Sequence, residues 1–169
     1  MHTAAMPHLA VIGLGANLGN PLDTLNRAIA HLQANNATSD WQVSPRYRTA
    51  PIGSDEAQPD YINAVASCRT TLAAEDFMRW LQDAERLFGR DRSQDVSRNA
   101  ARTLDLDLLL FDTLTMASSL LVLPHPRLHQ RAFVLRPLLD ILPDAVAPGL
   151  GRLDQYLPQV VEQAIDRLD

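Results

Sequence analysis

Two aspartates interrupt a long apolar run. Asp105 and Asp107 lie inside the stretch 104–111, whose other members are all leucine or phenylalanine. On a helix, residues two apart do not face each other. On a β-strand they share one face, about 6.6 Å apart. The pattern therefore predicts a strand with both carboxylates on one face, and the opposite face packs against helices through four residues: Leu104, Leu106, Leu108 and Leu110.

The segments around this strand predict an α+β fold. Asn20-Pro21 is a typical helix start, and Leu25, Ile29 and Leu32 follow at helical spacing. Pro45 indicates an edge or a bulge in its strand. We expect strands at 8–15, 41–49, 61–72, 102–112 and 118–123, and helices at 20–34, 73–89, 131–142 and 152–168. The order β-α-β-β-α-β predicts a ferredoxin-like core, a mainly antiparallel sheet with helices packed on it and C-terminal helical additions.

Composition narrows the classes of function. The length of 169 residues predicts a single domain, 1–169, and the net charge of −5 argues against a nucleic-acid binder. The N-terminus has no signal-peptide pattern and no run is long enough to span a membrane, so we expect a cytoplasmic protein. We also expect a monomer. Cys68 is the only cysteine, which excludes an internal disulfide. All 15 basic residues are arginines, so phosphate chemistry has to rely on arginines, metals or backbone amides.

Two long loops are expected, at 50–60 and 89–101. They exceed the usual length of connections in compact domains, which favours lids over a site. Between Arg86 and Arg102 there are five arginines and two aspartates, a local net charge of +3 in an acidic protein.

The aspartate pair has two interpretations. Two carboxylates on a partly shielded face repel each other unless cations compensate them. Mg²⁺ prefers such oxygen ligands and leaves positions for substrate phosphates. Alternatively, the two aspartates form salt bridges with nearby arginines on a solvated face, and the spacing alone favours this second interpretation.

Other motifs are ambiguous when taken alone. Gly13, Gly15 and Gly19 resemble a dinucleotide-binding turn, but the spacing GxGxxxG favours a tight turn with close helix packing. His125 and His129 lack a third ligand for zinc, so His125 is the better candidate to contact a phosphate or hydroxyl group. Tyr61 and Asn63 share a strand face, where an aromatic surface and an amide suit a flat heterocycle. Taken alone, the pair is more often a core tyrosine beside a surface asparagine.

Together and in this order, the motifs resemble one family, the 6-hydroxymethyl-7,8-dihydropterin pyrophosphokinases of folate biosynthesis. The resemblance covers about residues 9 to 140. It is carried by "GLGANLGN", "YRTAPIG", "QPDYINAV", "LQDAERLFGR", "RNAARTLDLDLLLF" and "LPHPRLHQRAFVLRPL".

The resemblance implies transfer of the β,γ-pyrophosphoryl group of ATP to the pterin hydroxymethyl oxygen, with release of AMP. It implies that Asp105 and Asp107 bind two Mg²⁺ ions and, with Arg90 and Arg102, form the catalytic set. The implied pterin pocket consists of Thr49, Ile52, Tyr61, Asn63 and Phe133. The implied ATP site consists of Gln82, Glu85, Arg92, Arg102, Leu108, His125 and Arg131.

Three alternatives remain at this point. A non-catalytic ferredoxin-like module that binds nucleotide or pterin is supported by Leu120 and Val122, which stand where the family often has an arginine and a threonine. The intact aspartate pair argues against it. A dinucleotide-dependent oxidoreductase is disfavoured by the element order, and a nucleic-acid binder by the charge and the 5% aromatic content.

Overall fold

One antiparallel sheet organises the chain, whose computed structural model describes residues 7–50, 59–89 and 103–169. Its long strands are β1 (His8–Ala16), β4 (Tyr61–Thr70) and β5 (Asp105–Phe111). The strand order is β10-β3-β4-β1-β5, and β2 also pairs with β4. The short members are β2 (Thr38–Val43), β3 (Tyr47–Thr49) and β10 (Ile165–Arg167). The predicted ferredoxin-like arrangement is confirmed.

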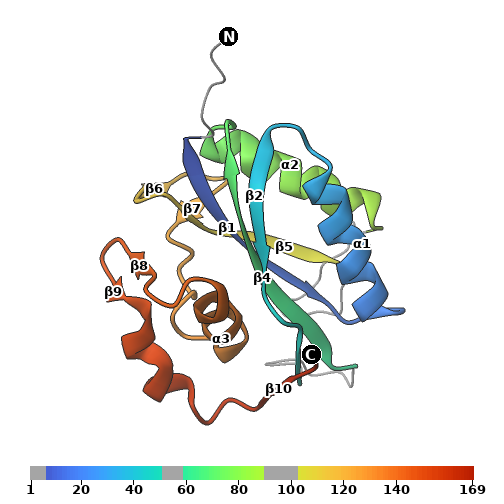
Figure 1. The fold of residues 1–169 in the computed structure, drawn as a ribbon, viewed down its shortest axis with the longest axis vertical. Coiled ribbons are helices and arrows are strands. Elements are labelled where there is room, and N and C mark those ends of the chain that lie inside the picture. The colour runs from blue at the N-terminus through green and yellow to red at the C-terminus, as the bar shows by residue number, and fades with distance from the viewer. Residues whose placement is uncertain (1–6, 51–58, 90–102) are drawn as a thin grey trace.

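Two helices cover one face of the sheet (Figure 1). The first, α1 (Pro21–Gln33), begins at the expected position, where the side chain of Asn20 accepts a hydrogen bond from the backbone N–H of Asp23 at 3.1 Å. The second, α2 (Ala74–Leu87), buries Phe77 and Leu81. Leucines of β5 pack against these helices, as the alternating pattern predicts.

The opposite face is covered only in part. The helix α3 (Ala132–Ile141) packs there with the 3₁₀ helix η2 (Leu153–Val160) and the small hairpin of β8 (Val146–Ala147) and β9 (Gly151–Arg152). Figure 1 shows α3 beside the lower half of β4. The end of the sheet that carries Asp105 and Asp107 remains accessible on this face.

Three expected elements differ from the structure. The strand expected at 41–49 is divided into β2 and β3 around Pro45, and the two parts pair with different halves of β4. Only β7 (Val122–Leu123) remains of the strand expected at 118–123, paired with β6 (Met116–Ala117) in a two-stranded hairpin. The helix expected at 152–168 is replaced by η2 and β10, because the end of the chain pairs with the open edge of β3.

A β-bulge changes the expected face of one leucine. Leu108 pairs with Ile12 and Leu110 with Val11, so Leu109 is an extra residue in β5. Leu110 therefore packs on the α3 side of the sheet with Leu109, and the prediction that it shares a face with Leu108 is wrong.

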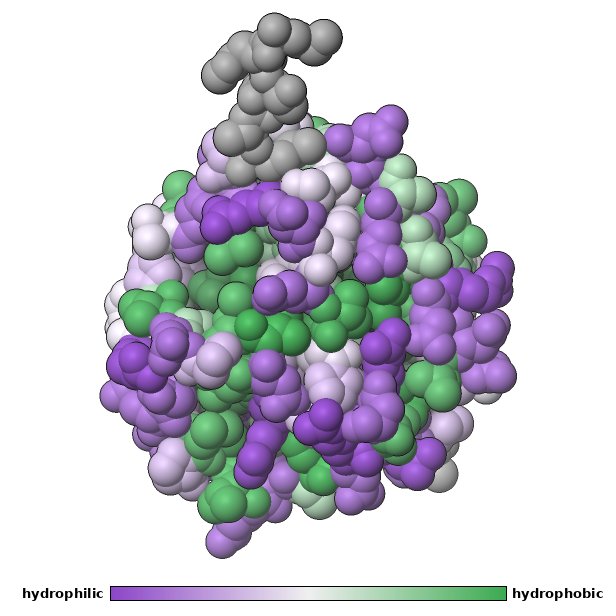
Figure 2. All heavy atoms as spheres, in the orientation of Figure 1, coloured by the Kyte–Doolittle hydropathy of each residue, from purple (hydrophilic) through white to green (hydrophobic). Residues whose placement is uncertain are grey.

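The molecular surface is mixed in character. On the face in Figure 2, hydrophilic side chains surround a band of hydrophobic ones. In the described parts of the chain, none of the helices combines the length and the apolar character needed to cross a bilayer.

Candidate active site

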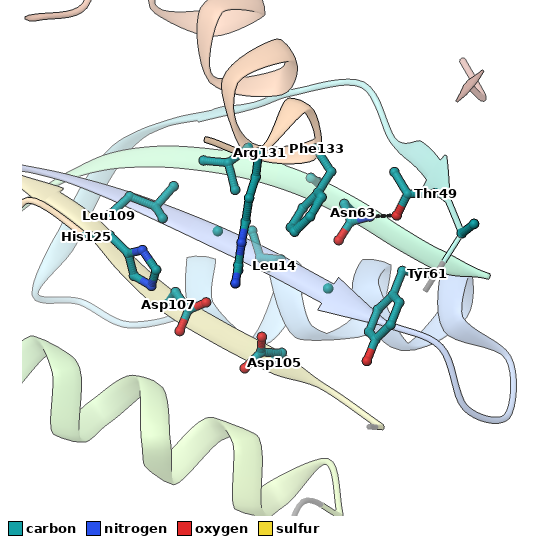
Figure 3. A pocket seen from close by; sticks show the side chains of 15 residues that line it. Leu14, Thr49, Tyr61, Asn63, Asp105, Asp107, Leu109, His125, Arg131 and Phe133 are labelled. Carbon is teal, nitrogen blue, oxygen red and sulfur yellow. Dashed lines mark hydrogen bonds between the residues drawn. The ribbon is translucent and has the colours of Figure 1, made fainter. Parts of the chain in front are cut away.

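A pocket opens on the α3 side of the sheet, at the end that α3 leaves accessible (Figure 3). Strands β1, β3, β4 and β5 line it, together with the segment before α3 and the first turn of that helix. Eight of the predicted site residues lie here: Thr49, Tyr61, Asn63, Asp105, Asp107, His125, Arg131 and Phe133. These eight residues, which are up to 84 positions apart in the sequence, thus share one cavity.

Two glycines create the space in this pocket. Gly13 pairs with Asp107 and Gly15 pairs with Asp105 across β1 and β5. A Cβ on Gly15 would lie 3.0 Å from Oδ1 of Asn63, whereas one on Gly13 would only make ordinary contact with Leu109 at 3.5 Å. The glycines therefore form the floor opposite the aspartates. Gly13 and Gly15 lie within the strand, so the tight turn expected for them is wrong.

The aspartates lie at the centre of the pocket. Asp105 and Asp107 both project from one face of β5, as the period of two predicts, while Leu106 and Leu108 are buried on the other face. In Figure 3, Asp107 lies toward His125, and Asp105 lies between Asp107 and Tyr61. The carboxylates thus connect two chemically different ends of one cavity.

One end of the pocket is suited to phosphate. The backbone N–H of His125 donates to the carbonyl of Leu109 at 2.9 Å, which fixes His125 beside β5. Its Nδ1 accepts a hydrogen bond from the backbone N–H of Arg127 at 3.2 Å. Burial, and then the positive charge of Arg131, lower the pKa of His125 below its usual value. The neutral ring therefore carries its proton on Nε2 and presents a hydrogen-bond donor.

Arg131 joins this end to the aromatic end. It immediately precedes α3, and its guanidinium carbon lies 5.4 Å from the centroid of the Phe133 ring. Figure 3 shows the side chain of Arg131 extending between Phe133 and His125 toward the aspartates. A permanent positive charge is thus directed at the centre of the pocket.

The other end is suited to a flat polar ring. Nδ2 of Asn63 donates to Oγ1 of Thr49 at 2.9 Å, and Asn63 is buried. That bond fixes the orientation of the amide. Phe133 comes from α3 and Tyr61 from the start of β4, so this end has two aromatic rings beside one amide.

Three other predicted residues lie on the α2 side of the sheet. Leu108 is buried in the core, and Glu85 is buried and accepts a hydrogen bond from the backbone N–H of Leu106 at 2.8 Å. Gln82 is half-buried on α2, one turn before Glu85. The structure does not bring these residues into the pocket: they lie on the other side of the sheet, at the edge formed by β5.

Four predicted residues lie outside the described parts of the chain: Ile52, Arg90, Arg92 and Arg102. The two expected lid loops fall largely in the same gaps, 51–58 and 90–102.

The donor set suits a metal that arrives with a phosphate-bearing ligand. Within residues 7–50, 59–89 and 103–169, no group of three or more His, Cys, Asp or Glu side chains could hold a metal ion. Mg²⁺ is commonly bound by one or two carboxylates while water and substrate phosphates supply its other ligands. Asp105 and Asp107 match that chemistry.

Sequence reasoning missed seven residues that line the pocket. They are small or apolar: Gly13, Leu14, Gly15, Ala50, Ala64, Leu109 and Val134. The available signal was the period of two in Gly13 and Gly15, which matches that of Asp105 and Asp107. Its meaning depends on the register between β1 and β5, which no local pattern specifies.

Comparison with known proteins gives consistent matches. Residues 11–143 match the family described as 7,8-dihydro-6-hydroxymethylpterin-pyrophosphokinase (HPPK). A 2-amino-4-hydroxy-6-hydroxymethyldihydropteridine pyrophosphokinase from Synechocystis is 38% identical over 156 residues, covering 92% of this chain and 76% of the relative. A protein of the same name from Haemophilus influenzae is 36% identical over 157 residues, covering 93% of each chain.

Solved structures agree on the fold. The crystal structure of an HPPK-DHPS in complex with substrates matches with a TM-score of 0.70 at 13% identity. The Plasmodium falciparum HPPK-DHPS with pteroate matches with a TM-score of 0.68, also at 13% identity. In both comparisons 92% of this chain is covered but only 43% of the longer chain. At this identity the likeness establishes the fold alone.

Proposed function

This chain belongs to the 7,8-dihydro-6-hydroxymethylpterin-pyrophosphokinase family, and from that membership we propose which of its residues perform the reaction. The enzyme is an ATP-dependent diphosphotransferase that transfers pyrophosphate to 6-hydroxymethyl-7,8-dihydropterin in folate biosynthesis. One observation carries the assignment of residues. Asp105 and Asp107 lie in a single pocket between a cationic end and an end with two aromatic rings and an amide.

The pterin occupies the aromatic end. The amide of Asn63 has a defined orientation because Thr49 accepts one of its hydrogen bonds, so its remaining donor and acceptor read the edge of the pterin ring. Tyr61 and Phe133 contact the faces of the ring. Ile52, outside the described residues, completes this pocket. The hydroxymethyl group then points toward the aspartates.

The triphosphate of ATP occupies the other end. Arg131 offers a planar, permanent cation, and His125 offers a neutral Nε2–H donor. Arg90, Arg92 and Arg102 act on the same phosphates from the segment outside the described residues. Gln82, Glu85 and Leu108 contact the nucleotide around the edge formed by β5. Such a site works by positioning the reactants and neutralising phosphate charge, which is what phosphoryl-type transfer requires.

Two Mg²⁺ ions would be held by Asp105 and Asp107. When bound, they would supply positive charge that neutralises the phosphates. The chain's own part is to present both carboxylates on one strand face, opposite glycines that leave space for ligands.

We also propose that residues 1–169 form a single pyrophosphokinase domain that acts as a cytoplasmic monomer, with ATP and the pterin as its ligands. Gel filtration with light scattering tests the monomer directly.

The test is incubation with ATP, Mg²⁺ and 6-hydroxymethyl-7,8-dihydropterin, followed by analysis of the nucleotide. AMP is the expected product. ADP would indicate ordinary kinase chemistry, and binding of both ligands without turnover would indicate a non-catalytic paralogue.

A pair of variants locates the reaction. Asp107→Ala should abolish AMP formation while the circular dichroism spectrum is retained. Asp144→Ala is the matched control, because Asp144 is exposed, pairs with Arg152 and does not line the pocket. Full activity in Asp107→Ala would defeat the assignment of the metal ligands.

A further inference from the structure

A hydrogen bond links strand β3 to the end of α3. The hydroxyl of Tyr47 donates to Oδ2 of Asp140 across 93 positions of sequence. Tyr47 is buried, with 5% of its surface exposed. Burial, and then the contact with Asp140, raise the pKa of Tyr47 to about 12, so the hydroxyl remains a donor throughout the physiological range.

Tyr47 lies next to the aromatic end of the pocket. It pairs directly with Asn63 across β3 and β4. It also shares a strand face with Thr49, two residues further along, and Thr49 accepts the hydrogen bond of Asn63. The position of Tyr47 therefore affects Asn63 and Thr49, the two polar residues at the aromatic end of the pocket.

Asp140 is connected through α3 to Phe133, the aromatic residue that faces Asn63 and Thr49 across the pocket. It follows Phe133 by seven residues on α3, which is about two helical turns, so the two side chains lie on the same side of the helix. Leu135 and Leu138, between them, are fully buried. The helix therefore transmits the position of Asp140 to Phe133.

The last turn of α3 is an unfavourable place for an acidic residue. The C-terminal end of a helix carries partial negative charge, and the last turn of α3 contains no basic residue. The hydrogen bond from Tyr47, with Arg136 and Arg167 close to the same tyrosine, compensates Asp140 at this position. At the other end of α3, Oε1 of Gln163 accepts from the N–H of Ala132 at 2.9 Å. The helix is thus held at both ends.

From these contacts we propose that Tyr47 and Asp140 are positioning residues that set the gap between Phe133 and the Asn63–Thr49 pair, and thereby the affinity for the pterin ring. The inference rests on the proposed function, because it assumes that this gap receives the pterin. It assigns neither residue a contact with substrate.

Kinetics of Tyr47→Phe provide the test. One lost hydrogen bond should raise KM for the pterin by about three- to tenfold, while KM for ATP and kcat stay within about twofold. Tyr156→Phe is the matched control. Tyr156 belongs to η2, its hydroxyl donates to the carbonyl of Leu150 at 2.9 Å, and it does not line the pocket.

Variants of Asp140 separate positioning from stability. Asp140→Asn keeps an acceptor and should preserve pterin affinity, whereas Asp140→Ala should reproduce the effect of Tyr47→Phe. The double variant should be no weaker than Asp140→Ala alone, because both changes remove one contact. If Tyr47→Phe lowers only the melting temperature, as is expected of Tyr156→Phe, and leaves pterin KM unchanged, the inference is overturned.

A direct titration makes the inference independent of turnover. The dissociation constant of the pterin is measured by its fluorescence in the presence of Mg²⁺ and a non-hydrolysable ATP analogue. If the unmodified protein binds pterin but forms no AMP, the proposed function fails, while weaker binding by Tyr47→Phe still supports the positioning role. If the unmodified protein does not bind pterin, both are refuted.

Discussion

Glu85 holds the strand that carries the two aspartates: its carboxylate accepts a hydrogen bond from the backbone N–H of Leu106 at 2.8 Å. Leu106 lies between Asp105 and Asp107, and only 1% of Glu85 is exposed. Among the residues that the structure describes, β5 is an edge strand, so this outward N–H has no neighbouring strand to bond. A side chain from α2 therefore replaces the missing strand at the point where the backbone presents its carboxylates.

Replacing Glu85 should affect stability and nucleotide binding together. Glu85→Ala leaves the buried N–H of Leu106 without its acceptor, which costs about 1–3 kcal/mol of unfolding free energy. We expect a weaker affinity for Mg-ATP as well, because the positions of Asp105 and Asp107 relax. Urea denaturation and isothermal titration measure the two effects.

Two variants calibrate this prediction. Glu85→Gln retains an acceptor oxygen and should lose less stability than Glu85→Ala. Glu75→Ala, on the same helix, removes an exposed carboxylate in the first turn that lies 3.9 Å from Arg79, so it should change stability by about 1 kcal/mol or less. Equal losses for Glu75→Ala and Glu85→Ala would contradict the role given to Glu85.

The two floor glycines should differ in tolerance. Gly15→Ala places a methyl group 3.0 Å from Oδ1 of Asn63, which is held by Thr49 and has to move. We expect KM for the pterin to rise by about tenfold, the equivalent of one hydrogen bond. Gly13→Ala meets only Leu109, at 3.5 Å, and should have a clearly smaller effect. The reverse ranking in steady-state kinetics would show that Gly15 does not set the position of Asn63.

Removing divalent metal should stop turnover without unfolding the protein. Asp105 and Asp107 lie on the pocket surface and belong to neither hydrophobic core cluster. Addition of a chelator should therefore abolish AMP formation but leave the melting temperature of the ligand-free enzyme nearly unchanged, and excess Mg²⁺ should restore activity. Turnover that persists in chelator would exclude the proposed dependence on metal.

The stability of the protein should fall at mildly acidic pH in a way that depends on His125. Burial and Arg131 lower the pKa of His125 in the folded protein, whereas in the unfolded chain it titrates at about 6.5. The unfolded chain therefore binds more protons as the pH falls through that value. The stability that depends on neutral His125 is complete above about pH 6.5 and is lost below it.

The matched variant for this pH dependence is His125→Gln, which cannot titrate. Urea denaturation at several pH values between about 7.5 and 5 should show a steeper loss in the unmodified protein than in the variant. Parallel curves would mean that the pKa of His125 is not lowered by folding. Nuclear magnetic resonance of the ring protons measures that pKa directly.

Local pattern predicted those parts of the site that depend on a single element. The period of two placed Asp105 and Asp107 together, and Asn20-Pro21 marked the start of α1, because a strand face and a helix cap are decided by neighbouring residues. The bulge at Leu109 was not visible, because it arises from pairing with β1. Nor could the contact between Tyr47 and Asp140 be read from the sequence, because it joins two elements that only the complete fold brings together.

The C-terminal end shows how tertiary context overrides local preference. Residues 152–168 have helical spacing of apolar residues, but β3 has an open edge, and Ile165–Arg167 pairs with it. The N–H of Leu168 also donates to the carbonyl of Arg46 at 2.8 Å. An edge supplied by a distant segment cannot be inferred from the segment that pairs with it.

The bulge in β5 has a consequence for how this enzyme can evolve. It fixes one register between β1 and β5, with the aspartates opposite glycines and the leucines against the helices. A shift of one residue would exchange the two faces and move both carboxylates into the apolar core. A single substitution in this strand leaves the register unchanged, but an inserted or deleted codon between Asp105 and Leu109 should be eliminated by selection.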